Sequence, residues 1–258
     1  MIIDASFKQR LRERPLIGCF VTFASPALTE FTAHLGFDFT LLDSEHGAMD
    51  TLAIEDMIRA SQCAGVPAMV RVPYNRPDYI RRALDSGAHG VQVPMVNSAR
   101  DAANAVTPSN FPPDGERGVA FLTRAAQYGM EPERATYFTR ANQAKVLSLH
   151  VETVEAVHNL DEILEAGGAD VYFVGPGDLA VSMGFGHDPN NKAVWETIER
   201  CIRTISSRGH IAGTLCTDAA RTQQAIDWGA HYIVTAISPF LIQGVTQYLR
   251  AVRPATGA

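Results

Sequence analysis

Eight short apolar runs alternate with longer amphipathic stretches along almost the whole chain, and this alternation limits the possible folds more than any other feature. The apolar runs cover residues 17–23, 39–42, 68–72, 90–93, 146–151, 171–174, 211–215 and 232–235. Most are continuously apolar, which is typical of parallel strands that are covered on both faces. We expect helices between them, most clearly over residues 52–64, 77–86, 154–166, 192–208 and 219–228.

The expected helices have suitable residues at their ends. Ser25, Asp50 and Thr217 precede helical stretches, and their side-chain oxygens can accept N-cap hydrogen bonds. Glycines follow five helices, where a left-handed backbone would end each one: Gly65, Gly87, Gly167, Gly209 and Gly229.

Eight strand–helix units in 258 residues predict an α/β fold, a (β/α)₈ barrel that forms one domain over residues 1–258. The alternative is an open doubly wound sheet, but no GxGxxG motif follows the first strand. The longest irregular stretch lies between the fourth and fifth strands, and long loops in compact domains are usually functional. We therefore expect an active-site loop at about residues 108–130. The final apolar stretch, residues 239–252, is expected to close the barrel or to dock on another subunit.

Composition argues against several other classes of protein. The 22 basic and 28 acidic residues give a net charge of −6, and the absence of a basic block argues against a nucleic-acid partner. No apolar run approaches the roughly 18 residues of a membrane span, and the basic N-terminus lacks the apolar core of a signal peptide. The four cysteines are too widely spaced to suggest a disulfide framework or a zinc cluster. We expect a cytoplasmic protein.

Polar residues gather where the second to sixth strands end, which is where (β/α)₈ enzymes place their catalytic groups. They are Asp43, Glu45 and His46 after the second strand, Arg71 on the third, Gln92 on the fourth, His150 and Glu152 on the fifth, and Gly177 and Asp178 after the sixth. Glu152 and Asp178 suit a hard divalent cation such as Mg²⁺, Mn²⁺ or Co²⁺. Either carboxylate could instead cap the helix that follows it.

The other strand-end residues also have both a functional and a structural interpretation. His46 beside two carboxylates can transfer a proton near neutral pH, although a lone histidine is more often structural. Arg71 on an apolar strand needs a partner, which is either a substrate oxygen or a structural aspartate. The turn before Asp178 either presents backbone N–H groups to an anion or is only a tight turn.

No lysine lies at the carboxyl end of an expected strand. The chain has only Lys8, Lys145 and Lys192, and Lys145 directly precedes the fifth strand, at its amino end. A Schiff-base aldolase needs a lysine in the mouth of the barrel. The sequence therefore argues against lysine-dependent catalysis.

Six motifs occur in a fixed order between Leu16 and Ile237: LLDSEHG, VRVP, DSGAHGVQVPMVNSA, GERGVA followed by RAAQYG, VETVEAVHNLDEIL, and FVGPGDLAVSMG. Together they resemble the metal-dependent (class II) 2-oxo-acid aldolases of the 4-hydroxy-2-oxoheptanedioate and 2-dehydro-3-deoxyglucarate aldolase type. These enzymes are grouped with citrate lyase β-subunits in the phosphoenolpyruvate/pyruvate barrel superfamily. The resemblance implies a carbon–carbon lyase that reversibly cleaves a 4-hydroxy-2-oxo acid, through a metal-stabilised enolate, to pyruvate (or a hydroxylated analogue) and an aldehyde. It also implies a homohexamer that exchanges the C-terminal helix between subunits.

The resemblance assigns catalytic roles to five residues. Arg71 would bind the keto or enolate oxygen and stabilise its charge. His46, paired with Asp85, would transfer the proton. Asp43 and Glu45 would support this site.

The resemblance also implies a divalent metal bound by Glu152 and Asp178, with no pyridoxal phosphate. Backbone amides at Gly177 and Asp178 would hold the substrate carboxylate, and Leu215 would line the substrate site. One position departs from the family, because His150 stands where these aldolases usually have glutamine. A neutral imidazole donates one hydrogen bond and can also ligate a metal. His150 is thus expected to bind substrate or to act as a third metal ligand.

Two other functions stay open. A related lyase or synthase for citrate or coenzyme A substrates would use the same site, although features of a coenzyme A site are not evident. A non-catalytic barrel that binds oxo acids is the second, and the polar set at the strand ends argues against it.

Overall fold

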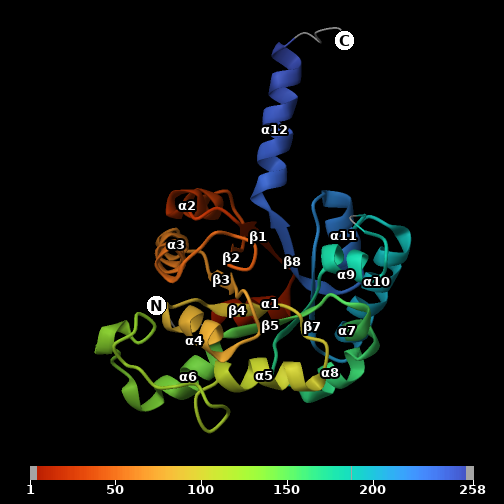
Figure 1. The fold of residues 1–258 in the computed structure, drawn as a ribbon. Coiled ribbons are helices and arrows are strands. Elements are labelled where there is room, and N and C mark those ends of the chain that lie inside the picture. Colours follow the sequence, from red (N-terminus) through yellow and green to blue (C-terminus); the bar gives the residue numbers. More distant parts are fainter. Residues whose placement is uncertain (1–4, 187, 254–258) are drawn as a thin grey trace.

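Eight parallel strands form a closed barrel in the structure, a computed structural model that describes residues 5–186 and 188–253 (Figure 1). Each strand pairs with the next one along the chain, and β8 pairs with β1. The strands are β1 (Leu16–Val21), β2 (Phe39–Asp43), β3 (Ala68–Arg71), β4 (Gly90–Val93), β5 (Val146–Val151), β6 (Val171–Val174), β7 (Ile211–Leu215) and β8 (Ala230–Ala236). The predicted (β/α)₈ barrel is confirmed, and the open doubly wound sheet is excluded.

Helices connect the strands on the outside of the barrel. They are α2 (Pro26–His34), α3 (Thr51–Cys63), α4 (Pro77–Asp85), α5 (Ala99–Ser109), α6 (Tyr137–Ala144), α7 (Val154–His158), α8 (Leu160–Ala166), α9 (Pro176–Ser182), α10 (Lys192–Ser207) and α11 (Ala219–Asp227), with the short 3₁₀ helices η1 (Gln127–Gly129) and η2 (Arg134–Thr136) between α5 and α6. The stretch predicted as one helix over residues 154–166 is two helices, because the backbone leaves helical geometry at Asn159.

Two of the three predicted N-caps are confirmed. Ser25 Oγ accepts a hydrogen bond from the backbone N–H of residue 28, and Asp50 Oδ1 accepts one from that of residue 53. The predicted cap at Thr217 is wrong, because α11 begins two residues later and the carboxylate of Asp218 takes the capping position. The five glycines predicted to end helices all have positive φ angles.

The helix α1 (Ser6–Glu13), which the sequence did not suggest, closes the amino end of the barrel. It buries Phe7 and Leu11 completely, and the Phe7 ring lies 5.4 Å from that of Phe39. The Phe39 ring reaches across the interior so closely that a Cβ at Gly18 would come within 2.2 Å of it. Only glycine therefore fits at position 18. Burial of a side chain such as Phe7 contributes about 1.5–3 kcal/mol to the stability of this end of the barrel.

The segment after α5, residues 110–136, lies at the amino end of the barrel, on the side away from α12 in Figure 1. Arg124 donates a hydrogen bond to the carbonyl of Ser86, and the N–H of Ala125 donates to the carbonyl of Asp85. Because α4 runs from the carboxyl end of β3 back to the amino end of β4, its last residues lie opposite the polar strand ends. The expected active-site loop at 108–130 therefore does not reach the site of its own chain.

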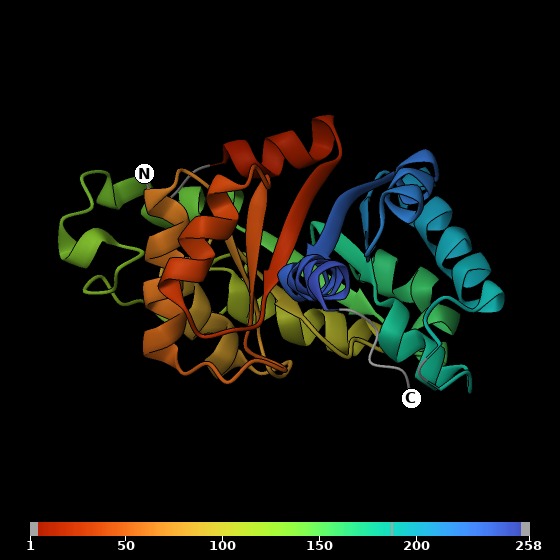
Figure 2. The ribbon, with the colours of Figure 1, turned by 90° about the horizontal axis from the view of Figure 1, so that it is seen from above.

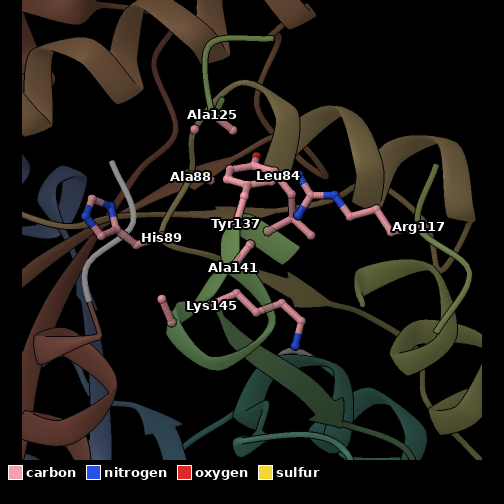
Figure 3. Close-up of a pocket in the computed structure, with 10 residues that line it drawn as sticks. Leu84, Ala88, His89, Arg117, Ala125, Tyr137, Ala141 and Lys145 are labelled. Carbon is pink, nitrogen blue, oxygen red and sulfur yellow. The ribbon is translucent and has the colours of Figure 1, made fainter. Parts of the chain in front are cut away.

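A cavity of about 30 Å³ lies beneath this segment, between α4 and α6 (Figure 3). Arg117 and Lys145 line the cavity. Figure 3 shows the Arg117 guanidinium beside the Tyr137 ring, whereas the Lys145 ammonium lies lower in the view, beyond Ala141. The two cations therefore do not converge on one ligand.

The buried Lys145 gives the protein a testable dependence of stability on pH. Lys145 is 7% exposed, and burial lowers its pKa to about 8. Between pH 8 and about 10.4, the unfolded chain binds more protons at this group, so the free energy of unfolding rises with pH. We expect Lys145→Met to raise the free energy of unfolding at pH 7 by about 3 kcal/mol, since each pKa unit is worth about 1.4 kcal/mol. Urea denaturation from pH 7 to 10.5 measures both effects.

The matched control is Lys192→Met, because the Lys192 side chain is 90% exposed. This variant should keep the rise in stability between pH 8 and 10.4. If Lys145→Met keeps the same rise, Lys145 is not its source.

The last helix, α12 (Ile237–Val252), continues from β8 and projects away from the barrel (Figures 1 and 2). Ile237 is its only buried residue, and large apolar side chains are exposed at Phe240, Leu241, Ile242, Val245, Tyr248 and Val252. The helix therefore does not close the barrel of its own chain, which leaves the second expectation, docking on another subunit. Within the described ranges, no helix is both long and apolar enough to cross a membrane.

Candidate active site at the carboxyl end of the barrel

Four neighbouring strands place polar side chains in the barrel interior near its carboxyl end. Asp43 on β2 lies opposite Arg71 on β3, and Arg71 lies opposite Gln92 on β4. His150 follows on β5, two residues beyond the partner of Gln92. Successive side chains of a strand point to opposite faces, so these residues face inward while their apolar neighbours face the helices. Asp43, Gln92 and His150 are each at most 1% exposed.

Arg71 is held rigidly by carboxylates. Its Nε and Nη2 donate to Oδ1 and Oδ2 of Asp43 over 2.9 and 2.7 Å, and its Nη1 lies 3.1 Å from Glu45 Oε2. The guanidinium also lies 4.7 Å from the centre of the Phe20 ring. Arg71 therefore has the structural partner that the sequence left open, and its charged group is fixed at the mouth of the barrel.

The pKa shifts around Arg71 follow from burial and from this pairing. Burial alone would raise the pKa of Asp43, but the hydrogen bonds and charge of Arg71 outweigh it and the pKa is lowered. Burial raises the pKa of Glu45, and the charge of Arg71 only partly opposes this shift. Burial would lower the pKa of Arg71, but the carboxylates outweigh it and the pKa is raised. The ion pair between Asp43 and Arg71 is therefore fully charged near neutral pH.

The turn after β2 presents His46 at the mouth of the barrel. Asp43 Oδ1 also accepts hydrogen bonds from the backbone N–H groups of Glu45 and His46. A Cβ at Gly47 would lie 2.2 Å from the Asp43 carbonyl oxygen, so the turn requires glycine there. The imidazole of His46 is 63% exposed, and its Nε2 lies 3.9 Å from Glu45 Oε2. The ring is thus accessible to a substrate.

Asp85 does not pair with His46 within one chain. It is the last residue of α4, at the amino end of the barrel, and its Oδ1 accepts a 2.6 Å hydrogen bond from Arg117. His46 follows β2 at the opposite end. The expected pair is therefore wrong for a single chain, because α4 runs from one end of the barrel to the other and carries Asp85 to the end opposite His46.

Glu152 is buried and held on both carboxylate oxygens. Its Oε2 lies 2.6 Å from His150 Nδ1, and its Oε1 accepts a 2.8 Å hydrogen bond from the N–H of Met95. Burial would raise the pKa of Glu152, but the interactions with His150, Met95 and Arg71 outweigh it and the pKa is lowered. The carboxylate is therefore charged, as a metal ligand must be.

His150 does not have the role expected of it. Its Nδ1 contacts Glu152, its Nε2 lies 2.6 Å from Gln92 Nε2, and its ring stacks on Phe173 at 4.8 Å. Both ring nitrogens are taken by protein groups. The expectation that His150 binds substrate or a metal is therefore not supported by this geometry.

Asp178 lies in the first turn of α9, directly after β6, and is exposed. The turn before it packs on Glu152, since a Cβ at Gly175 would lie 3.0 Å from Glu152 Oε2. Gly177 is exposed beside Asp178, and Leu215 ends β7 against the interior apolar cluster. The elements thus bring the end of β5 and the start of α9 together.

The donor set suits a hard divalent cation. Among the described residues, no three His, Cys, Asp or Glu side chains are arranged to hold a metal ion. A Mg²⁺-type site often uses only one or two carboxylates, with waters and substrate oxygens in the other positions. The charged carboxylate of Glu152 and the exposed one of Asp178 meet that requirement.

Three contributors to the site were missed from sequence. Gln92 was noted at a strand end without a role. The signal for its role was that it is the polar residue near the end of the strand that follows those of Asp43 and Arg71. Phe20 reads as an ordinary apolar strand residue. Met95 contributes its backbone N–H from a left-handed conformation, φ +56°, which nothing in the sequence indicates.

The chain is similar to aldolases over nearly its whole length. The family model described as HpcH/HpaI aldolase/citrate lyase matches residues 16–242. The hydroxypyruvate/pyruvate aldolase of Roseovarius nubinhibens is 36% identical over 88% of both chains, and the 5-keto-4-deoxy-D-glucarate aldolase of Salmonella arizonae is 33% identical over 96% of both. The crystal structure of an HpcH/HpaI aldolase/citrate lyase family protein from Burkholderia cenocepacia has a TM-score of 0.90 at 34% identity, covering 97% of this chain and 100% of that one. The chain therefore belongs to the HpcH/HpaI aldolase/citrate lyase family.

Proposed function

We propose that this protein is a metal-dependent carbon–carbon lyase, which reversibly cleaves a 4-hydroxy-2-oxo acid to pyruvate (or a hydroxylated analogue) and an aldehyde. One observation carries the proposal: the fixed guanidinium of Arg71 and the buried, charged carboxylate of Glu152 lie on nearby strands at one end of the barrel. Two similar proteins are named aldolases, which supports the same reaction.

The residues of the site suit the steps of a retro-aldol cleavage. Breaking the carbon–carbon bond leaves an enolate, and Arg71 is placed to stabilise its negative charge. The exposed His46 accepts the proton of the 4-hydroxyl group as the carbon–carbon bond breaks and the aldehyde forms, and protonation of the enolate carbon then gives pyruvate. A divalent cation held by Glu152 and Asp178 supplies Lewis-acid polarisation of the substrate oxygens when it is bound.

Three residues complete the proposed substrate site. The backbone amides at Gly177 and Asp178 hold the substrate carboxylate, and Leu215 provides an apolar wall. The mechanism uses neither a Schiff-base lysine nor pyridoxal phosphate.

A pyruvate-release assay over a panel of 4-hydroxy-2-oxo acids tests the proposal. We expect release with Mg²⁺, Mn²⁺ or Co²⁺, loss of release after EDTA treatment, and recovery when metal is returned. If the EDTA-treated protein cleaves equally fast, the metal dependence is wrong. A requirement for coenzyme A would favour the alternative lyase, and tight oxo-acid binding without turnover would favour a non-catalytic barrel.

We also propose that the protein is a cytoplasmic homo-oligomer, a hexamer by family resemblance, in which α12 docks on a neighbouring subunit. The exposed apolar side chains of α12 support this, since burying each would contribute about 1.5–3 kcal/mol. In the proposed assembly, Asp85 of one subunit pairs with His46 of another.

Removing residues 240–258 should therefore convert the assembly to smaller species, as measured by light scattering. The double variant Ile242→Glu/Val245→Glu should have the same effect without shortening the chain. If both variants keep the wild-type mass, α12 does not hold subunits together.

A further inference from the structure

We propose that Gln92 and His150 form a positioning relay that fixes the Glu152 carboxylate for a divalent cation. His150 is then a positioning residue, and it binds neither metal nor substrate. The inference rests on the proposed function, because it takes Glu152 as a ligand of the cation.

The relay begins with the amide of Gln92. With the amide oriented as in the structure, its NH₂ group faces His150 Nε2 at 2.6 Å. An amide NH₂ only donates, so Nε2 of the ring accepts and the ring proton is on Nδ1. That Nδ1–H then donates to Glu152 Oε2, also over 2.6 Å. Gln92 thereby selects the tautomer that His150 needs to hold the carboxylate.

The second carboxylate oxygen is held from another strand end. Met95 donates its N–H to Glu152 Oε1 from a left-handed backbone, a conformation that is strained for a non-glycine residue. Each oxygen of Glu152 thus accepts one hydrogen bond from the protein and keeps lone pairs for a ligand. The backbone at Gly175 packs so closely on Oε2 that a Cβ there would lie 3.0 Å away. These contacts restrict the carboxylate to one orientation.

Direct ligation by His150 would require breaking this arrangement. The ring is 1% exposed and stacks on Phe173 at 4.8 Å. Turning it toward a metal ion would remove both hydrogen bonds and leave Gln92 and Glu152 with unpaired polar atoms in a buried place, which is costly. Partners that orient metal ligands in this way typically change metal affinity 10- to 100-fold when they are lost.

The first test is Mn²⁺ binding to the substrate-free protein by calorimetry. His150→Phe keeps the stacking ring but loses both nitrogens, so we expect Mn²⁺ to bind about 10- to 100-fold more weakly. His150→Asn places an amide nitrogen where Nδ1 was, and it should rescue most of the affinity. Gln92→Met should weaken binding less than His150→Phe does.

Ser148→Ala is the matched control, because Ser148 is fully buried on the same strand and its hydroxyl has no hydrogen-bond partner. It should bind Mn²⁺ like the wild type, and thermal melting should show that every variant is folded. Wild-type affinity in His150→Phe would overturn the relay.

The second test reads the tautomer directly in metal-free protein. Nitrogen-15 NMR of histidine-labelled wild type should show a proton on Nδ1 of His150, with the signal identified by its loss in His150→Phe. A proton on Nε2 alone would overturn the relay and leave the aldolase proposal intact. Conversely, an Nδ1 proton and weakened Mn²⁺ binding in His150→Phe, without pyruvate release by the wild type, would support the relay and contradict the proposed reaction.

Discussion

Replacing Glu152 with glutamine should lower kcat for metal-dependent pyruvate release by a factor of about a thousand or more, which corresponds to about 4 kcal/mol of transition-state stabilisation. The amide has nearly the same shape as the carboxylate but no charge, so it is a poor ligand for a hard cation. In the native protein each Glu152 oxygen contacts one donor, Met95 N–H or His150 Nδ1, so the NH₂ group of the variant would also face one of these donors. Steady-state kinetics over a range of Mn²⁺ concentrations measure the loss.

The control for this change is Glu155→Gln, three residues further along the chain. Glu155 lies exposed on α7, so its loss should leave both kcat and the Mn²⁺ dependence unchanged. If Glu152→Gln retains wild-type activity at the same Mn²⁺ concentration, Glu152 is not a metal ligand.

Replacing Arg71 with methionine should reduce both activity and stability. We expect kcat/KM to fall about a thousandfold, because the group that stabilises the enolate is lost. We also expect the free energy of unfolding to fall by about 3–5 kcal/mol, because the 1%-exposed carboxylate of Asp43 loses its partner. Kinetics and urea denaturation measure the two effects separately.

A second substitution distinguishes these two roles of Arg71. The double variant Arg71→Met/Asp43→Asn has no unpaired charge at the fully buried position 43, so it should recover much of the stability while activity stays low. Folding lowers the pKa of Asp43, so the wild type should lose the stabilisation by this pair as pH falls below about 4. The double variant should lack that loss. Recovery of activity together with stability would contradict the catalytic role of Arg71.

The strands and most of the helices could be predicted because local periodicity reports burial. A continuously apolar run such as 171–174 can be covered on both faces only in the middle of an α/β fold, and all eight runs became strands. The predictions failed where the signal was weak. Helix α1 has only two buried residues, and the break at Asn159 interrupts a stretch whose amphipathic pattern continues.

The site could be predicted in part, since parallel strands bring their carboxyl ends together. Asp43, Arg71 and His150 therefore had to lie near one another, and the structure places them on three strands of one wall. Asp85 could not be placed in this way. Its motif suggested a role beside His46, but its position depends on which end of the barrel α4 reaches.

The amino-acid sequence by itself determined the eight-stranded barrel and the types of side chain at its carboxyl end, because strand periodicity and strand order are local properties. Only the tertiary structure decided which atoms meet: Arg71 with Asp43, both nitrogens of His150 with Gln92 and Glu152, and Asp85 at the far end with Arg117. It also decided that α12 projects from the barrel rather than packing against it. The physical reason is that contacts between residues far apart in the chain depend on strand register and barrel closure, which no local pattern encodes.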